Sequence, residues 1–267
     1  MQPHYPERIV CLTEEPTETL YLLGEQHRIV GISGFTVRPP QARKEKPRVS
    51  AFTSANTEKI LALNPDLIIG FSDLQADIAA ELVRNGQSVL LFNHRSVEEI
   101  LSMILTLGGL VGAQEKGQQL VERLQDEINT VLASAKKLTR RPTVYFEEWD
   151  DPMISGIRWV SDLVSIAGGD DCFAELAAQP LGKDRIIADP QTVIDRNPDI
   201  IIGSWCGKKF RPDKLSERPG WQSVKAVANR QLYEIKSVNI LQPGPAALTD
   251  GLKQMHDIML NWHQSCA

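Results

Sequence analysis

Four side chains near predicted strand ends could bind a flat ligand by stacking or by metal ligation. Trp205 and Cys206 directly follow one predicted strand, Trp149 follows another, and Trp159 stands just before a predicted helix. Aromatic rings offer large, rigid apolar surfaces to planar ligands, and a cysteine thiolate is a soft metal ligand. The competing interpretation is packing: tryptophans fill cores and domain interfaces, and a cysteine at a strand end is often a small core residue.

Charged residues near the same predicted strand ends could contact polar groups of a ligand. Glu15 follows the first strand and could accept hydrogen bonds from ligand amides or meet a cationic group, although an acidic residue there also favours the start of the next helix. Arg38 and Arg185 could bind a phosphate or carboxylate through two hydrogen bonds. Solvation at the surface is the alternative for both arginines.

The sequence lacks the signatures of several enzyme classes. It contains no GxGxxG or GxxxxGK[ST] phosphate loop and no GxSxG nucleophile elbow. No histidine lies near Cys206 in sequence to activate its thiol, and the five histidines show no paired spacing typical of a metal site. We therefore predict no enzymatic activity, no resident cofactor and no dedicated metal site.

One segment occurs twice and indicates how the chain is organised. Residues 64–70 read NPDLIIG, and residues 197–203 read NPDIIIG. In each copy a turn set by proline precedes an apolar run, which is typical of a strand buried on both faces of a parallel sheet. Strands and helices alternate along both halves, which favours βαβ units. Two similar α/β lobes predict a ligand cleft between them, because α/β proteins bind ligands at the carboxyl ends of parallel strands.

A long helix is expected between the lobes. Apolar residues recur at spacings of three and four over residues 114–137, with charged residues on the opposite face. We predict an α/β fold of two Rossmann-like lobes with parallel sheets joined by one long α-helix. The predicted domains are residues 1–110 and 141–267, with residues 111–140 as the connecting helix. A helical connector predicts small lobe rotations.

Composition limits the classes of protein to consider. The net charge of −5 gives no support for nucleic-acid binding, and no apolar run reaches the length of about 20 residues that spans a bilayer. The four cysteines lack CxxC spacing, so neither a zinc site nor a disulfide framework is predicted. Residues 1–7 are polar and show no signal peptide. We expect a cytoplasmic protein if this chain is complete, and a periplasmic or cell-envelope protein if an export signal preceded it.

The order and spacing of several motifs resemble those of the substrate-binding proteins of ABC importers for cobalamin, haem and ferric siderophores, and most closely the cobalamin-binding members. The resemblance covers nearly the whole chain and is strongest between residues 8 and 110. The motifs are Leu23-Gly24, Val30-Gly31-Ile32-Ser33, Arg38-Pro39-Pro40-Gln41-Ala42, Asn56-Thr57-Glu58-Lys59-Ile60, Ile166-Ala167-Gly168-Gly169 and the two copies of Asn-Pro-Asp.

The resemblance implies particular site residues. The aromatic residues that hold the corrin in the first lobe of the cobalamin binders fall on Phe35 and Phe52, while a tryptophan of their second lobe falls near Arg185, which is a departure. The family docks on its permease through one surface glutamate per lobe. Glu58 matches the first of these, and the second falls on Gln191.

We therefore expect a monomeric binding protein that captures cobalamin or a related corrinoid for an ABC permease, with no nucleic-acid partner. Phe35 and Phe52 would face the ligand from one lobe, and Trp149, Trp159 and Trp205 from the other. One alternative changes the ligand to a siderophore or haem. The other is an intracellular carrier of corrinoids or metal chelates without a permease.

Overall fold

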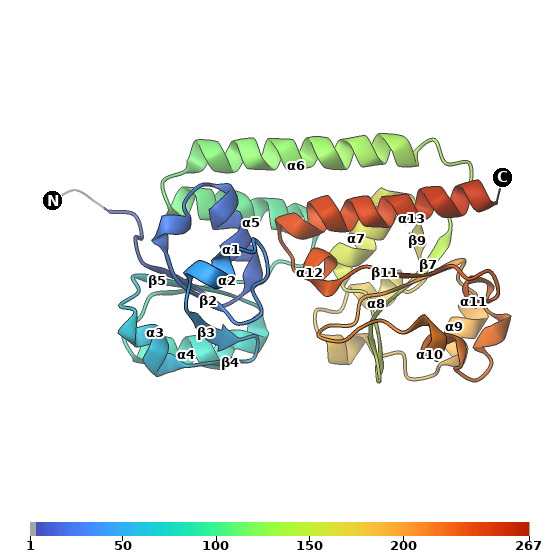
Figure 1. The fold of residues 1–267 in the computed structure, drawn as a ribbon, viewed down its shortest axis with the longest axis horizontal. Coiled ribbons are helices and arrows are strands. Elements are labelled where there is room, and N and C mark those ends of the chain that lie inside the picture. Colours follow the sequence, from blue (N-terminus) through green and yellow to red (C-terminus); the bar gives the residue numbers. More distant parts are fainter. Residues whose placement is uncertain (1–3, 267) are drawn as a thin grey trace. The chain divides into compact units, whose positions relative to one another are not determined.

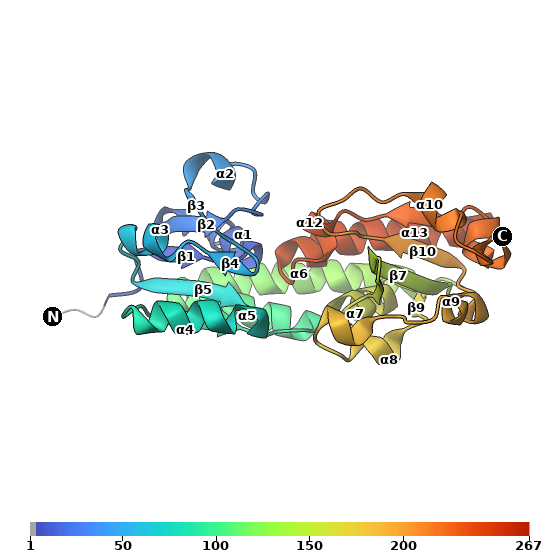
Figure 2. The ribbon, with the colours of Figure 1, turned by 90° about the horizontal axis from the view of Figure 1, so that it is seen from below.

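The computed structural model describes residues 4–266 and forms two compact units. Unit 1 consists of the chain up to His94 together with Glu98–Leu124, and unit 2 of Arg95–Val97 together with the chain from Gln125 onward. Residues 1–3 of the predicted polar start and residue 267 of the predicted second lobe lie outside the described residues. Each unit has its own sheet flanked by helices, which confirms the predicted α/β fold (Figures 1 and 2).

The sheet of unit 1 has six strands in the order β4-β3-β2-β1-β5-β6. All neighbours are parallel except β4, which forms an antiparallel hairpin with β3 at one edge. The first copied segment supplies β5, whose five residues are all buried, as its continuous apolar run predicts. The strands are β1 (Ile9–Cys11), β2 (Ile29–Ser33), β3 (Arg48–Ala51), β4 (Ser54–Ala55), β5 (Leu67–Phe71) and β6 (Val89–Phe92).

Four α-helices lie between these strands in the chain, and a fifth follows the last strand. They are α1 (Glu14–Leu22), α2 (Ala42–Glu45), α3 (Thr57–Ala62), α4 (Ala76–Arg84) and α5 (Val97–Leu110). The acidic residues that follow the first strand already belong to α1, which begins at Glu14. Proline is tolerated in the first turn of a helix, and carboxylates are favourable there. The acidic residues after β1 therefore belong to the helix.

The sheet of unit 2 has the order β11-β10-β7-β8, and β9 also pairs with β7. Its strands are β7 (Thr143–Asp150), β8 (Met153–Ser155), β9 (Asp170–Asp171), β10 (Ile200–Gly203) and β11 (Leu232–Glu234). β7 is longer than its apolar start predicts, because antiparallel pairing with β8 extends it to Asp150. Trp149 therefore lies on a strand and not in a loop.

Seven α-helices of the described chain belong wholly to unit 2: α7 (Arg158–Ala167), α8 (Ala174–Ala177), α9 (Gln191–Arg196), α10 (Pro212–Ser216), α11 (Lys225–Ala228), α12 (Ser237–Ile240) and α13 (Leu252–Ser265). Trp221 is fully buried in a core cluster of unit 2, and Trp262 is 4% exposed. None of the helices in residues 4–266 combines the length and the apolar character that a bilayer crossing requires.

The predicted long helix is α6 (Gln114–Ala135), and it contributes residues to both units. In unit 1, Lys116 of α6 forms an ion pair of 2.9 Å with Glu25. In unit 2, the Ser134 hydroxyl lies 2.8 Å from Nε2 of His256, whose Nδ1 lies 2.8 Å from the carbonyl oxygen of Ala167. A salt bridge thus fixes one half of α6, and a buried histidine fixes the other.

The two Asn-Pro-Asp copies have the same structural role in both units. Asn64 and Asn197 end α3 and α9 in the left-handed conformation, with φ of 46° and 47°, which asparagine tolerates better than most residues. The Asp66 carboxylate accepts hydrogen bonds of 2.7 and 3.0 Å from two backbone amides just before β1. The Asp199 carboxylate accepts bonds of 3.0 and 2.9 Å from the backbone amide and hydroxyl of Thr143, where β7 begins. Each copy therefore joins the end of a helix to the start of a neighbouring strand.

Candidate functional site

Unit 1 presents aromatic surface just beyond the carboxyl ends of β2 and β3. The side chain of Phe35 is 59% exposed, and its backbone amide donates to the Ser33 hydroxyl at 3.1 Å. Phe52 is half-buried. The buried Gln75 side chain fixes the loop carrying Phe52, because its amide donates to the Phe52 carbonyl at 2.9 Å while its oxygen accepts from the backbone amide of Phe71 at 3.1 Å. No sequence pattern predicted the role of Gln75.

The acidic residues after β1 are buried within unit 1. One carboxylate oxygen of Glu15 accepts from the Thr13 hydroxyl at 2.7 Å, and the other has no hydrogen-bond partner among the described residues. Burial and the neighbouring Glu14 carboxylate raise the pKa of Glu15 to about 8. Glu15 is therefore mostly protonated at neutral pH and could donate a hydrogen bond. Arg38, half-buried, donates to Glu18 at 2.8 Å.

A buried polar network occupies the centre of the unit 2 sheet. The Glu147 carboxylate, fully buried on β7, accepts hydrogen bonds from the Tyr145 hydroxyl at 3.0 Å and from the Trp205 indole at 3.0 Å. Arg218 donates two further bonds to it, of 2.6 and 3.0 Å. Burial and the Glu147 carboxylate raise the pKa of Tyr145 well above its ordinary value. Trp205 is 4% exposed, so its indole serves this network.

Arg185, another predicted ligand residue, is hydrogen-bonded within unit 2. Its side chain is 2% exposed and donates two parallel hydrogen bonds, of 2.8 and 3.0 Å, to the Glu148 carboxylate. It also contacts the carbonyl oxygen of Ser155. A bidentate pair of this kind is among the strongest hydrogen-bonded contacts in proteins. The guanidinium that could bind a ligand anion already has a carboxylate partner.

The remaining candidates of unit 2 differ in accessibility. The Trp159 indole is 4% exposed and donates to the Ile240 carbonyl at 2.9 Å. Trp149 is half-buried, and its indole donates to the carbonyl of Asp151 at 2.9 Å. The Lys208 ammonium lies 4.3 Å from the centre of the Trp149 ring and 5.3 Å from that of Trp205. These cation–π contacts bring Trp149, Trp205 and Lys208 together.

The predicted ligand residues thus fall into two groups by burial. Glu15, Trp159, Arg185 and Trp205 are buried within their own units. Phe35 and Cys206 are exposed, and Phe52, Arg38 and Trp149 are partly accessible. Ligand contact stays a prediction for all nine residues, and the accessible ones need no rearrangement of their unit to make it.

The two predicted docking residues occupy equivalent positions. Glu58 lies in the first turn of α3, and Gln191 begins α9. Each stands six residues before the asparagine of its Asn-Pro-Asp copy, and both are exposed. Gln191 donates to Asp195 at 2.8 Å. The duplication therefore supports the alignment of Gln191 with Glu58, although docking itself remains a prediction.

No group of three or more histidine, cysteine or carboxylate side chains within residues 4–266 is arranged to hold a metal ion. Cys206 is exposed on the loop after β10, where its sulfur could reach a metal centre carried by a ligand.

Comparison with known proteins gives one family. Residues 9–238 match the model of a family described as periplasmic binding protein. A relative from Bacillus subtilis (strain 168), named an uncharacterized ABC transporter substrate-binding lipoprotein, YvrC, is 24% identical over 94% of this chain and 79% of its own length. A vitamin B12-binding protein from Vibrio cholerae is 28% identical over 95% of this chain and 89% of its own length.

Solved structures show the same fold. The periplasmic heme-binding protein RhuT from Roseiflexus sp. RS-1, solved in its apo form, superimposes with a TM-score of 0.79 at 25% sequence identity. The alignment covers 95% of this chain and 99% of RhuT. Similarity to the heme-binding protein is thus close to that to the vitamin B12-binding protein.

Proposed function

Since this chain belongs to the periplasmic binding protein family and is a substrate-binding protein of ABC importers, we propose that it captures cobalamin or a related corrinoid and delivers it to a permease. The vitamin B12-binding relative, aligned over 95% of this chain, supports a corrinoid as the first candidate. We propose that the protein works as a monomer in the cell envelope and performs no chemistry on its ligand.

The exposed ring of Phe35 carries the ligand proposal. The Phe35 side chain is 59% exposed beyond the end of β2. A flat ligand that covers this ring removes apolar surface from water, which makes binding more favourable. An aromatic side chain buries roughly 150–250 Å² when fully covered, so covering the exposed 59% of Phe35 contributes about 2–4 kcal/mol at 25 cal/mol per Å². Phe52 adds ring surface in unit 1, and Trp149 adds it in unit 2.

A direct test compares cyanocobalamin binding by the wild type and by Phe35→Ala. All five tryptophans lie in unit 2, so the Phe35 substitution leaves the fluorophores unchanged while quenching of tryptophan fluorescence reports binding. We expect roughly 30- to 700-fold weaker binding, as a loss of about 2–4 kcal/mol requires. Leu22→Ala is the matched control, because Leu22 is 48% exposed at the opposite end of α1 from Glu15. Equal affinities for the wild type, Phe35→Ala and Leu22→Ala would exclude Phe35 as a ligand-binding residue.

Haem or a ferric siderophore is the second candidate ligand. The similarity to the heme-binding RhuT and the exposed thiol of Cys206 favour it. A thiolate bound to haem iron changes the Soret absorption, so spectra of the wild type and of Cys206→Ser with haemin test this candidate. Identical spectra would exclude ligation by Cys206, and absence of any spectral change would exclude haem.

A further inference from the structure

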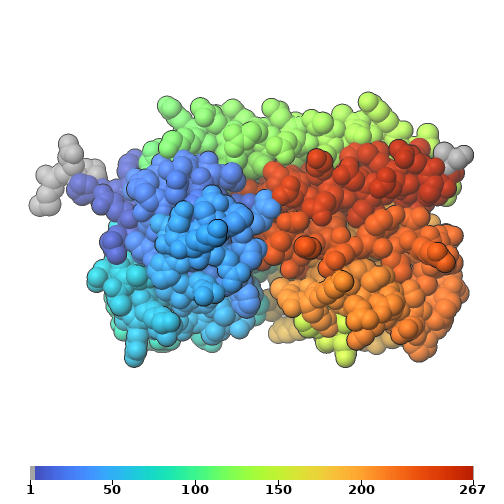
Figure 3. All heavy atoms as spheres, in the orientation of Figure 1, coloured from blue at the N-terminus to red at the C-terminus, as the bar shows by residue number. Residues whose placement is uncertain are grey.

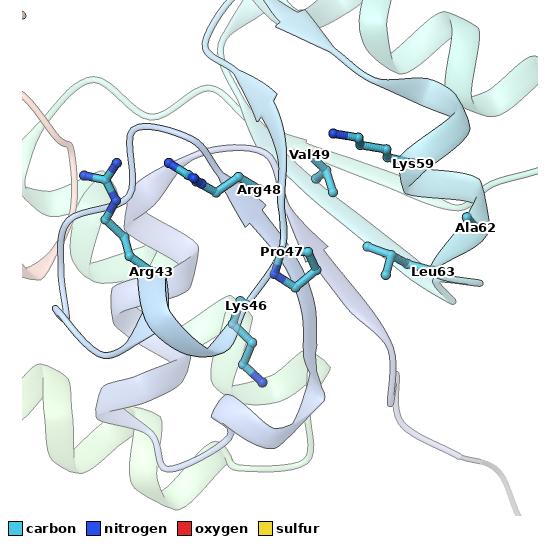
Figure 4. Close-up of a pocket in the computed structure, with 8 residues that line it drawn as sticks. All are labelled: Arg43, Lys46, Pro47, Arg48, Val49, Lys59, Ala62 and Leu63. Carbon is cyan, nitrogen blue, oxygen red and sulfur yellow. The ribbon is translucent and has the colours of Figure 1, made fainter.

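A basic pocket lies on the surface of unit 1, and none of the residues predicted to contact the ligand lines it. Its volume is about 490 Å³, and it is bounded by the segment that joins α2 to β3 and by α3 (Figure 4). Arg43, Lys46 and Arg48 come from the first side, and Lys59 comes from α3. Figure 3 shows the segment around α2 at the surface of the unit.

The pocket has a cationic rim and an apolar floor. Pro47, Val49, Ala62 and Leu63 form the floor. In Figure 4 the Arg48 side chain extends toward Arg43, and Lys59 reaches back from α3 toward Val49, while Lys46 is directed away from them. Arg48, on β3, and Lys59, on α3, therefore line the pocket from two different elements of the fold.

The positive charge of this pocket is not neutralised by neighbouring carboxylates. None of the eight lining residues is acidic, and no ion pair involves the four cations among residues 4–266. Glu45, the acidic residue within the same segment, accepts a hydrogen bond of 2.7 Å from the Tyr21 hydroxyl. Like charges on Arg43, Arg48 and Lys59 at the rim of one pocket, in a chain with a net charge of −5, repel one another, and a bound anion would relieve this repulsion.

We propose that this pocket binds an organic phosphate, a phosphate group attached to a compact apolar body. Arginine matches phosphate oxygens through two parallel hydrogen bonds, and lysine adds a point charge. The volume falls in the usual range of about 300–1,000 Å³ for small-molecule sites and exceeds the needs of a bare phosphate ion. The apolar floor would cover the body of the ligand.

A structural role for the same cations makes a different prediction. The β3–β4 hairpin forms an edge of the sheet, and lysines near an exposed edge discourage pairing with other chains. That role requires positive charge but no complementary ligand, so it predicts no saturable binding. Saturation therefore separates the two roles.

The test is a calorimetric titration of the full chain at low salt, with inorganic phosphate and with phenyl phosphate in separate experiments. We expect saturable binding of both, with phenyl phosphate the tighter ligand because its ring covers the apolar floor. Arg48→Gln/Lys59→Gln should lower the affinity for phenyl phosphate at least about tenfold. Lys44→Gln/Arg84→Gln is the control, because it removes the same charge from exposed positions outside the pocket.

Two further arms complete the test. Sedimentation with vesicles of phosphatidylglycerol and phosphatidylcholine in equal parts distinguishes a phospholipid headgroup from a soluble ester as the natural source. If Arg48→Gln/Lys59→Gln fails to fold by circular dichroism, the exposed Lys59→Gln alone is used, with Lys44→Gln as its control. Absence of saturation, or equal weakening by the pocket and control substitutions, would overturn the proposal. Cyanocobalamin binding is measured in parallel and should be unchanged.

Discussion

Replacing the buried Glu147 by glutamine should destabilise unit 2 strongly. Its carboxylate is fully buried and accepts four hydrogen bonds, two of them from Arg218, whose side chain is only 18% exposed. The amide preserves the size of the side chain but removes the charge, so it leaves a cation buried without its partner. Breaking a buried ion pair in this way costs about 3–5 kcal/mol.

Urea and thermal unfolding followed by tryptophan fluorescence measure this cost selectively, because all five tryptophans lie in unit 2. For a unit of this size, about 2–4 °C of melting temperature corresponds to 1 kcal/mol, so we expect a fall of roughly 6–20 °C. Asp170→Asn is the matched control. It breaks the more exposed pair with Arg141, whose contribution is at most about 1 kcal/mol.

A double-mutant cycle then isolates the pair. Glu147→Gln/Arg218→Met should cost less than the sum of the two single substitutions by about 1–3 kcal/mol, because it leaves no unpaired charge. Strict additivity, or a Glu147→Gln protein as stable as Asp170→Asn, would refute the reasoning.

Three further predictions follow from burial, close packing and surface charge. Glu15 has a folded-state pKa of about 8 against an ordinary 4.5, so the folded protein holds a proton that the unfolded chain has lost between these values. The free energy of unfolding should therefore fall by up to about 1.4 kcal/mol per pH unit as pH rises through this window. Glu15→Gln should flatten the dependence of the urea midpoint on pH, and an unchanged slope would contradict the assignment. A Cβ atom at Gly203 would lie 2.0 Å from the Phe210 ring, so Gly203→Ala should lower the free energy of unfolding by at least about 1–3 kcal/mol. If thermal unfolding shows an unchanged stability, the ring moves freely and the prediction is wrong. Glu58→Gln should weaken binding to a cognate permease in detergent without changing ligand affinity, and equal permease affinity would exclude docking through this residue.

Local sequence patterns predicted much of the architecture. The apolar runs after the two Asn-Pro-Asp segments became β5 and β10, and the amphipathic stretch from Gln114 became α6. These signals are local because each element's hydrophobic pattern is determined by its own burial. The repeat was informative for the same reason: Asn64 and Asn197 each end a helix within a few residues of a buried strand.

The candidate site was harder to predict because its contacts join residues far apart in the chain. The Trp205 indole reaches Glu147 across 58 residues, and Arg185 reaches Glu148 across 37. A tryptophan or arginine after a strand looks the same in sequence whether it faces a ligand or a buried carboxylate. The exposed ring of Phe35 likewise depends on tertiary packing.

The central claim, that this chain captures a flat metal-containing ligand, is tested most directly by calorimetric titration of the wild-type protein with cyanocobalamin, haemin and a ferric chelate in turn. We predict saturable binding of cyanocobalamin well below 1 mM, the concentration at which binding is worth only about 4 kcal/mol. Saturation by haemin or the chelate alone would assign the second candidate ligand instead. Absence of binding for all three would contradict the account.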